Sequence, residues 1–362
     1  FAHLDPAVFL AGLPTPKPKP LRIAGRDTLL RREILPIKDK CFLIIDEAHR
    51  AMGDGYMKLI ARFRERYRVV YILLTSATPY RLDGKPLGTI ADTLVEPTTP
   101  RQLMDAGIIH EPLVKSVTTI DADGLPVRRG DFVSTELEVR AKKLSGNVVS
   151  EWLRWCDGYP GVVRAVSVAH SKQLVERFIA AGLRAAHLDG ETPLAERSRI
   201  LARLAIGGQI AGNAEGIDVL CQVDVASEGW NPPSDYDRAL ELWGDKTPPY
   251  VPICILSDAR PTMSACGYRQ FEGRGCRTSG AMLETSRGLR PALPKPWFRF
   301  LDHAKNYERH GFLEDHFGFS LDSGAPTSRA PRDKRGLVSA RYCPQCLSVW
   351  PSGRTVCACG SA

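Results

Sequence analysis

The sequence lacks an apolar run long enough to cross a membrane, and its opening residues, FAHLDPAVFLAGLP, lack the charged front and long apolar core of a signal peptide. We therefore expect a soluble, cytoplasmic chain with no membrane partner. The sequence also has no Gly-x-x-x-x-Gly-Lys-Ser/Thr phosphate loop and no short-period repeat, and position 1 is Phe rather than Met. From the missing phosphate loop and the Phe at position 1 we expect a chain that is truncated at its N-terminus.

The composition is that of an ordinary globular protein, with 43% hydrophobic and 25% charged residues among 362. That is enough material for two hydrophobic cores and some appendages. A formal net charge of +8 suits a polyanionic partner such as nucleic acid, although charge alone does not identify one. Of the ten cysteines, Cys41, Cys221 and Cys254 stand inside apolar runs, and such single buried thiols indicate a reducing compartment.

Residues 41–49 read CFLIIDEAH, an apolar run that ends in an acidic pair. A buried parallel strand delivers carboxylates to a nucleotide site in this way. Asp46 would hold Mg²⁺ near the phosphates, and Glu47 would polarise the attacking water. Taken alone, the same residues could also be an exposed helix start. The stretch points to an ATP-driven motor.

Apolar strands and helical patterns alternate along the chain, which predicts parallel sheets. A helical pattern at 56–67 precedes an apolar strand at 69–74 that ends in TSATP, whose hydroxyls could relay hydrogen bonds to Glu47. A plain strand-to-helix turn is the alternative for TSATP. A second series opens with a strand at 162–168 and a helix capped by Ser171. Regular patterning weakens between the two series and fades again beyond about residue 279.

Two later motifs carry polar side chains. Residues 268–277 read YRQFEGRGCR and place Arg274 and Arg277 on one face of a predicted helix, where both could reach phosphate oxygens. A solvated basic helix is the alternative, but the two glycines in the motif make it less attractive. Residues 226–233 read ASEGWNPP, which indicates a shaped loop, with a simple exit loop as the alternative.

The ordered motifs resemble those of superfamily two DEAD/DEAH-box helicases. The resemblance rests on LIIDEAH, LTSATPYRLDG, VAHS, HLDGETPLAER, ASEGWNPP, ARPTMSACGYRQFEGRGCR and LDHAKNYERHG, which together span nearly the whole chain. The most similar branch is that of RadD and phage helicases, related to type III restriction helicase subunits. The joint order and spacing of these motifs is far more specific than any one of them.

The resemblance implies roles for individual residues. In the first domain, Asp46 would coordinate Mg²⁺, Glu47 would be the catalytic base, and His49 would link the ATP site to the other domain. Ser76 and Thr78 would couple hydrolysis to strand movement. The implied second-domain nucleotide and finger residues are Gly229, Asn231, Gln270, Arg274 and Arg277. The expected nucleic-acid-binding residues are Thr28, Arg32, His170, Ser171 and Glu228.

The sequence departs from the family pattern at two points of the ATP site. Asn231 stands where the family usually has Asp, which removes a charge that could orient motif residues or the ribose. The phosphate loop and the first nucleic-acid motif are also missing, and with them the Lys and the backbone cradle for the β- and γ-phosphates. We therefore expect the chain as written not to hydrolyse ATP efficiently.

Four cysteines cluster at the end of the chain, as Cys343-x-x-Cys346 and Cys357-x-Cys359. Four thiolates within so short a stretch suit tetrahedral Zn²⁺, and the pattern is typical of a short zinc ribbon. The family's second pair is usually spaced C-x-x-C, so the C-x-C pair is a further departure. Free surface thiols are the alternative, and the expected role of the metal is structural or nucleic-acid contacting.

The sequence thus predicts an α/β protein with two RecA-like P-loop NTPase domains, the first truncated, and a small zinc-ribbon-like module. The expected segments are a partial first domain at 1–110, a connector at 111–145, a second domain at 146–290, an extension at 291–337 and the module at 338–362.

The expected activity is that of an ATP-dependent DNA or RNA helicase or translocase with ATP, Mg²⁺ and Zn²⁺ as cofactors, hydrolysing ATP at the interdomain cleft. DNA is the preferred partner, with single-stranded-DNA-binding or repair proteins as further ones. The alternatives are a non-catalytic nucleic-acid-binding protein and the motor subunit of a restriction system.

Overall fold

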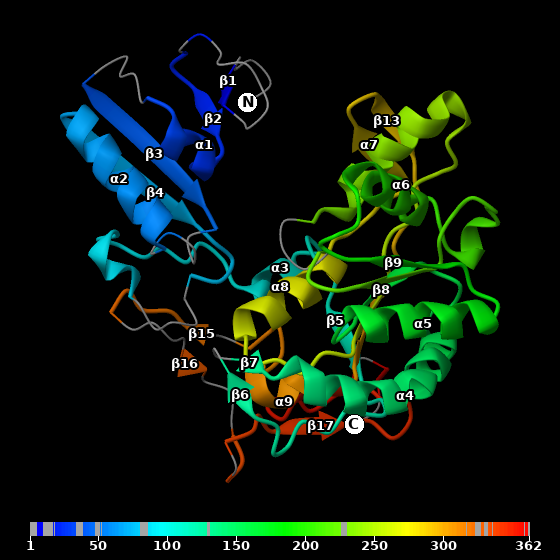
Figure 1. Ribbon diagram of the computed structural model, residues 1–362. Helices are drawn as coiled ribbons and strands as arrows, with labels where there is room; N and C mark the ends of the chain where they lie inside the picture. The colour runs from blue at the N-terminus through cyan, green and yellow to red at the C-terminus, as the bar shows by residue number, and fades with distance from the viewer. Residues whose placement is uncertain are drawn as a thin grey trace. The chain divides into compact units, whose positions relative to one another are not determined.

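The computed structural model describes residues 6–9, 17, 19–33, 39–47, 51, 53–79, 86–128, 131–225, 230–315, 317–322, 327–328, 332–334, 336–357 and 359–360 (Figure 1). The chain forms two compact units, one from 1–96 with 317–327 and the other from 97–316 with 328–362. Within the described residues, no helix combines the length and apolar character that a membrane span requires. Each unit is described by itself below.

The first unit is built on two parallel strands, β3 (Lys40–Asp46) and β4 (Val69–Thr75), linked through helix α2 (Asp54–Arg66). Alternate strand residues such as Ile45 pack with Ile60 of α2 in a small core. Phe42, Ile44, Tyr71 and Leu73 alternate with these core residues along β3 and β4, and they are 44% to 63% exposed. The remaining elements of the unit are β1 (Ala7–Phe9), β2 (Arg22–Ala24), α1 (Arg26–Arg31), the 3₁₀ turn η2 (Leu87–Thr89) and β15 (Phe317–Gly318).

The second unit contains a six-stranded sheet in which every neighbouring pair is parallel. Its strands, in spatial order, are β5 (Pro112–Lys115), β14 (Phe298–Asp302), β11 (Ile255–Asp258), β8 (Gly161–Arg164), β10 (Val219–Gln222) and β9 (Ala185–Leu188). The predicted α/β class is therefore confirmed, with a central parallel sheet.

Helices cover both faces of this sheet, because its central strands are buried on both sides. Val162 and Leu256 point to a core that includes residues of α6 (Leu194–Ala205) and α8 (Ala265–Gly275). Their neighbours Val163 and Ile255 point to the opposite core, which is closed by α4 (Ser134–Trp155) and α5 (Val168–Ala180). Helices α4 and α5 run next to each other in Figure 1 and are in contact.

Two strands of the sheet come from stretches where the sequence pattern is weak. Strand β5 lies in the expected connector, and β14 lies beyond residue 279, where regular patterning fades. They form one side of the sheet, with β14 paired to β11 and β5 paired to β14. A four- or five-residue strand carries too short a pattern to stand out when its neighbours are distant in sequence.

The predicted start of the second series needs one correction. Strand β8 ends at Arg164 rather than continuing to Val168, which is instead the first residue of helix α5. Ser167, not Ser171, caps the helix, and its hydroxyl accepts a hydrogen bond from the His170 backbone N–H at 3.1 Å.

The remaining elements are short or peripheral. They are α3 (Pro100–Asp105), β6 (Val127–Arg128), β7 (Asp131–Phe132), η3 (Gln209–Ala211), α7 (Pro232–Trp243), η4 (Gly244–Lys246), β12 (Met282–Thr285), β13 (Gly288–Pro291), α9 (Asn306–His310), β16 (Thr327–Ser328), β17 (Ala340–Tyr342) and β18 (Val349–Pro351). Strands β17 and β18 form an antiparallel pair next to the terminal cysteines.

Candidate functional site

The acidic pair lies at the carboxyl end of β3, beside the end of β4. Asp46 is in register with Thr75, and the Thr75 hydroxyl donates a hydrogen bond to Asp46 Oδ1 at 2.9 Å. The Glu47 backbone N–H donates to the same oxygen at 2.9 Å. Asp46 is solvent-exposed, so a hydrated cation can reach its carboxylate. The structure thus brings together the two polar strand ends, and the predicted hydroxyl relay to Glu47 stays a prediction.

Glu47 adopts a φ of 56°, a conformation that a residue with a side chain rarely takes. The chain therefore turns sharply directly after Asp46 and leaves the direction of the strand. Backbone conformations of this kind are concentrated at functional sites, where the surrounding structure holds them in place. His49, the third predicted residue of this motif, lies outside the described residues.

Ser76 and Thr78 follow β4 at the same edge. The Thr78 backbone N–H donates to Ser76 Oγ at 3.1 Å, and Thr78 is only 3% exposed, so these residues form a tight local turn. Thr28 lies on α1 and is buried, while the Arg32 carbonyl that follows this helix accepts a hydrogen bond from Arg62 of α2 at 2.8 Å. Their predicted roles in coupling and nucleic-acid binding stay predictions.

In the second unit, a row of polar side chains crosses the carboxyl edge of the sheet. Asp302, Asp258, Arg164 and Gln222 end strands β14, β11, β8 and β10 and occupy one register row. All four are 4% exposed or less. Arg164 Nε donates to Asp258 Oδ1 at 2.8 Å, and Arg164 Nη2 donates to Oδ2 at 2.5 Å. This bidentate pair is the strong geometry for a buried ion pair.

The row also fixes the start of helix α8. Arg164 Nη1 donates to the Gly267 carbonyl at 3.2 Å, and Asn306 donates to Asp258 Oδ2 at 2.9 Å. Burial, together with the neighbouring Asp258 charge, raises the pKa of Asp302 to about 7. Because these groups are buried, they position α8 rather than offer ligands at the surface.

Helix α8 carries Gln270 and Arg274, both half-buried, but it ends at Gly275. The prediction that Arg274 and Arg277 share one helix face is therefore wrong for Arg277, which instead forms a β-bridge with Ile109. At the end of the helix the side chain of Lys295 donates to the Gly275 carbonyl and so satisfies one of its terminal acceptors.

The two arginines nevertheless line one pocket, together with Lys295 and Tyr250. Burial lowers the pKa of Lys295 to about 8, and burial together with Arg274 lowers the pKa of Arg277. The other lining residues are three prolines, Ile253, Thr278 and Ser279, and the Lys295 ammonium donates to the Ile253 and Gly275 carbonyls. Such a pocket suits an anion with several oxygens.

His170 and Ser171 lie at the start of α5, and both are 0% exposed. The Ser171 hydroxyl is 2.7 Å from His187 Nδ1, and His187 Nε2 is 2.9 Å from Asp189 Oδ2. The His187 hydrogen bond, opposed by a small burial effect, lowers the pKa of Asp189 to about 2. Ser171 therefore supports the loop after β9, whereas His170 Nδ1 accepts a hydrogen bond from the Val166 N–H at 3.3 Å. The predicted contact of both residues with nucleic acid stays a prediction.

The loop motif at 226–233 is described only from Trp230 onwards, so Glu228 and Gly229 lie outside the described residues. Asn231 stands at the N-cap position of α7, and its side-chain amide donates to Ser234 Oγ at 2.6 Å. Trp230 Nε1 donates to Asp235 at 2.6 Å, and burial raises the pKa of that carboxyl to about 6. The half of the motif that is described therefore anchors a helix start.

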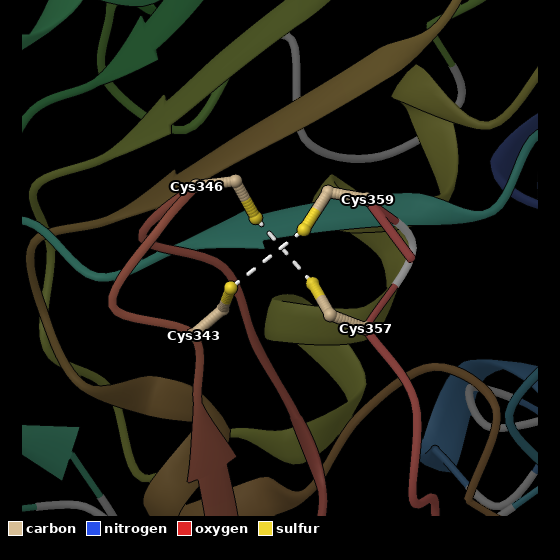
Figure 2. A group of neighbouring side chains, drawn as sticks. All are labelled: Cys343, Cys346, Cys357 and Cys359. Atoms are coloured by element: carbon tan, nitrogen blue, oxygen red, sulfur yellow. Dashed lines mark hydrogen bonds between the residues drawn. The ribbon is translucent and has the colours of Figure 1, made fainter. Parts of the chain in front are cut away.

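The four terminal cysteines converge in the second unit (Figure 2). Their sulfurs all lie within 4.8 Å of one another, with Cys343 Sγ 3.7 Å from Cys359 Sγ and Cys346 Sγ 3.4 Å from Cys357 Sγ. These distances exceed a disulfide bond of ~2.05 Å. A tetrahedral Zn²⁺ with Zn–S bonds of ~2.3 Å sets its sulfurs roughly 3.8 Å apart, so the cluster fits this ion.

Protonation within the cluster is uneven. Burial opposes ionisation of Cys346, but hydrogen bonds with Ser348 and neighbouring cysteines outweigh it and lower its pKa to about 6. Burial raises the pKa of Cys357 to about 12. A bound Zn²⁺ deprotonates coordinating thiols outright, so all four could serve as ligands once the metal is present.

An ionic network holds the cysteine module to the rest of its unit. Arg354 pairs with Glu111 and lies 4.0 Å from Glu314. Arg101 reaches the same two carboxylates at 3.4 Å and 3.3 Å. The module is therefore attached beside strand β5 and not suspended on a free tail.

Sequence reasoning missed Lys295 and the buried row of Arg164, Asp258 and Asp302. A signal for the row was present, because each of its charged members ends an apolar run, as in GVVR and CILSD. No comparable signal marks Lys295, which follows a proline-rich stretch and meets α8 only in the folded chain.

Comparison with known proteins gives distant similarities. No protein-family model matches the chain. The chain is 25% identical over 325 residues to the "51.5 kDa protein" of Lactococcus phage (isolate 7-9), a match that covers 89% of this chain. The chain spans 61% of the length of that curated relative.

Among solved structures, S. cerevisiae Dbp5 bound to RNA and ADP BeF3 is similar with a TM-score of 0.45 and 13% identity, covering 84% of this chain and 68% of that one. The Pyrococcus furiosus Hef helicase domain is similar with a TM-score of 0.37 and 12% identity, covering 79% of this chain and 77% of that one. These values are too low to carry an inference about the present chain.

Proposed function

We propose that this chain belongs to a nucleic-acid-dependent ATP hydrolase of helicase or translocase type, built on RecA-like domains of the RadD and phage-helicase branch. DNA is the proposed nucleic acid. The observation that carries the proposal is the Asp46 carboxylate, held by Thr75 and the Glu47 N–H at the carboxyl edge of two parallel strands.

The chemistry of this edge supports the assignment. Open parallel sheets bind ligands outside the carboxyl ends of their strands, and a carboxylate there can hold Mg²⁺. Hydrogen bonds from Thr75 and Glu47 fix Asp46 Oδ1, which leaves Oδ2 as the proposed metal-facing atom. Glu47 would then orient the water that attacks the terminal phosphate, as catalytic carboxylates do in phosphoryl transfer.

The pocket of Arg274, Arg277 and Lys295 gives independent support. A triphosphate carries several negative charges, and guanidinium groups neutralise the charge that develops during phosphoryl transfer. Lys295 holds the end of α8 through the Gly275 carbonyl, which positions Arg274 beside Arg277. Bound Mg²⁺ would supply charge neutralisation of the phosphates; the printed sequence contains no phosphate loop to cradle them.

We further propose that the four cysteines bind a structural Zn²⁺. All four ligand positions of the tetrahedron would come from protein sulfurs, so no position remains for a catalytic water. The metal would stabilise a module that otherwise has a very small core around Trp350.

The proposed activity is tested by ATP hydrolysis with and without single-stranded DNA. The assay uses the full-length gene product, as wild type and as Glu47→Gln. We expect DNA-stimulated hydrolysis in the wild type and a loss of about 10²-fold or more in Glu47→Gln. Glu65→Gln, on the exposed surface of α2, is the matched control and should keep full activity.

Stimulated hydrolysis that survives Glu47→Gln would contradict the proposed role of the acidic pair. DNA binding without hydrolysis in the wild type would favour the non-catalytic binding protein instead. A requirement for a nuclease subunit encoded nearby would favour the restriction motor.

A further inference from the structure

Lys115 ends strand β5 and reaches into the cysteine module. The residue is 4% exposed, and its Nζ donates to the Cys346 carbonyl at 2.9 Å and to the Ser348 hydroxyl at 2.9 Å. Its ammonium also lies 4.4 Å from the centre of the Trp155 ring. A charged side chain from the edge strand of the sheet is therefore enclosed between an aromatic face and the second cysteine of the cluster.

A buried ammonium is costly unless a negative charge compensates it. The two hydrogen-bond acceptors of Lys115 are neutral, and within the described residues no carboxylate lies within ion-pair distance of its Nζ. The Trp155 ring offers only a modest attraction. The packing around Lys115 thus leaves most of its charge without a counter-ion from carboxylates.

The cysteine cluster can supply that charge. Four thiolates around one Zn²⁺ carry a net charge of −2, and the four sulfurs lie within 4.8 Å of one another in the module that Lys115 contacts. Lys115 contacts the backbone of Cys346 directly, so its ammonium lies beside the cluster.

We propose that Lys115 is the counter-ion of the metal-loaded cysteine cluster and raises its affinity for zinc. The inference rests on the proposed zinc site and adds a residue from the edge of the parallel sheet to it. Lys115 acts through the charge of the cluster and not as a ligand, so it is a positioning and tuning residue. Zinc binding and the attachment of the module to the sheet would then be energetically coupled.

A purely mechanical role for Lys115 is the competing explanation. The module has other attachments, because the Ser116 N–H donates to the Leu347 carbonyl at 2.7 Å and Arg354 pairs with Glu111. Removing the Lys115 charge should therefore leave the module in place. A mechanical clamp would stabilise the metal-free and metal-loaded forms equally, whereas a counter-ion favours the metal-loaded form.

The test measures the zinc affinity of the whole chain by competition with a chromophoric chelator, for wild type and Lys115→Met. Methionine is unbranched, keeps most of the length of the side chain and removes the charge. We expect zinc affinity to fall about 10- to 100-fold, the range typical of groups that support metal ligands. Lys172→Met, exposed on α5, is the matched control and should bind zinc as the wild type does.

Thermal unfolding of the metal-free and metal-loaded forms supplies the second measurement. We expect Lys115→Met to lower the melting temperature of the metal-loaded form more than that of the metal-free form, while Lys115→Arg restores most of the zinc affinity. If Lys115→Met does not fold, Lys115→Gln removes the charge and keeps hydrogen-bonding groups.

Unchanged zinc affinity in the charge-removing variant, or equal losses of stability in both metal states, would overturn the proposal while leaving the zinc site intact. A wild-type chain that binds no zinc would overturn the zinc site and the role of Lys115 together.

Discussion

Glu272 makes the stability of the second unit depend on pH in a way that one substitution can isolate. The residue lies on α8 and is 0% exposed, and neither of its carboxylate oxygens has a hydrogen-bond partner in the described part of the chain. Burial raises the pKa of this carboxyl to about 8, although nearby Arg269 favours the charged form. The folded protein therefore keeps Glu272 protonated at neutral pH, when an unfolded chain would have released the proton.

The expected effect follows from proton linkage. The contribution of Glu272 to the free energy of unfolding is fully present below the ordinary Glu pKa of about 4.5 and is lost as pH rises through about 8. Between these two values the carboxyl ionises in the unfolded chain but stays protonated in the folded one. Each pH unit in the window is worth about 1.4 kcal/mol. Between pH 5 and pH 8 the wild type should therefore lose roughly 4 kcal/mol of unfolding free energy through this group.

Glu272→Gln replaces the protonated carboxyl with a neutral group of similar shape and removes this dependence. Urea unfolding at pH 5, 6, 7 and 8 gives the free energy of each protein, and the difference between them cancels titrations that both share. We expect the free energy of unfolding of the variant, relative to that of the wild type, to increase steadily as pH rises. Glu136→Gln, at an exposed position of α4, is the control, and its free energy of unfolding should depend on pH as that of the wild type does. Parallel curves for wild type and Glu272→Gln would refute the reasoning.

Two further predictions concern the packing that positions α8. A Cβ on Gly275 would lie 2.0 Å from Phe298 Cε2, and that ring is fully buried, so Gly275→Ala should cost about 1–3 kcal/mol of unfolding free energy in urea titrations. Gly273→Ala on the same helix meets no atom within 4 Å and should be neutral or stabilising by up to about 1 kcal/mol; equal losses in both variants would contradict this account. Arg164→Met leaves the Asp258 charge buried without its arginine and should cost about 3–5 kcal/mol, measured in the same way. Adding Asp258→Asn to Arg164→Met should recover part of that loss, and no recovery would show that the pair does not carry the effect.

Several features of the candidate site could be predicted from local sequence. The apolar run before Asp46 predicts a buried strand that ends in a carboxylate. Strand β3 does end at that residue, but the prediction of burial is wrong for one face, on which Phe42 and Ile44 are exposed. The alternation of apolar strands and amphipathic helices predicts the α/β class. The spacing of the cysteines predicts a cluster, because four residues so close in sequence need only short turns to meet.

Other predictions failed or could not be made, for local reasons. Arg277 does not continue the face of α8, because the helix ends at Gly275 and Arg277 pairs with Ile109 instead. The edge strand β5 was expected to be connector, since its few residues become a strand only when β14 pairs with them. Ser167 caps α5 in place of Ser171 because β8 stops earlier than its apolar run.

The sequence by itself determined the strand that presents Asp46, the class of the fold and the grouping of the four terminal cysteines, because each depends on residues that are neighbours in the chain. Only the tertiary structure decided that Thr75 hydrogen-bonds Asp46, that Lys295 joins Arg274 and Arg277 in one pocket, and that Lys115 lies beside the cysteines. These contacts join residues far apart in sequence. Strand register and core packing bring them together, and no local pattern of residue types records such pairings.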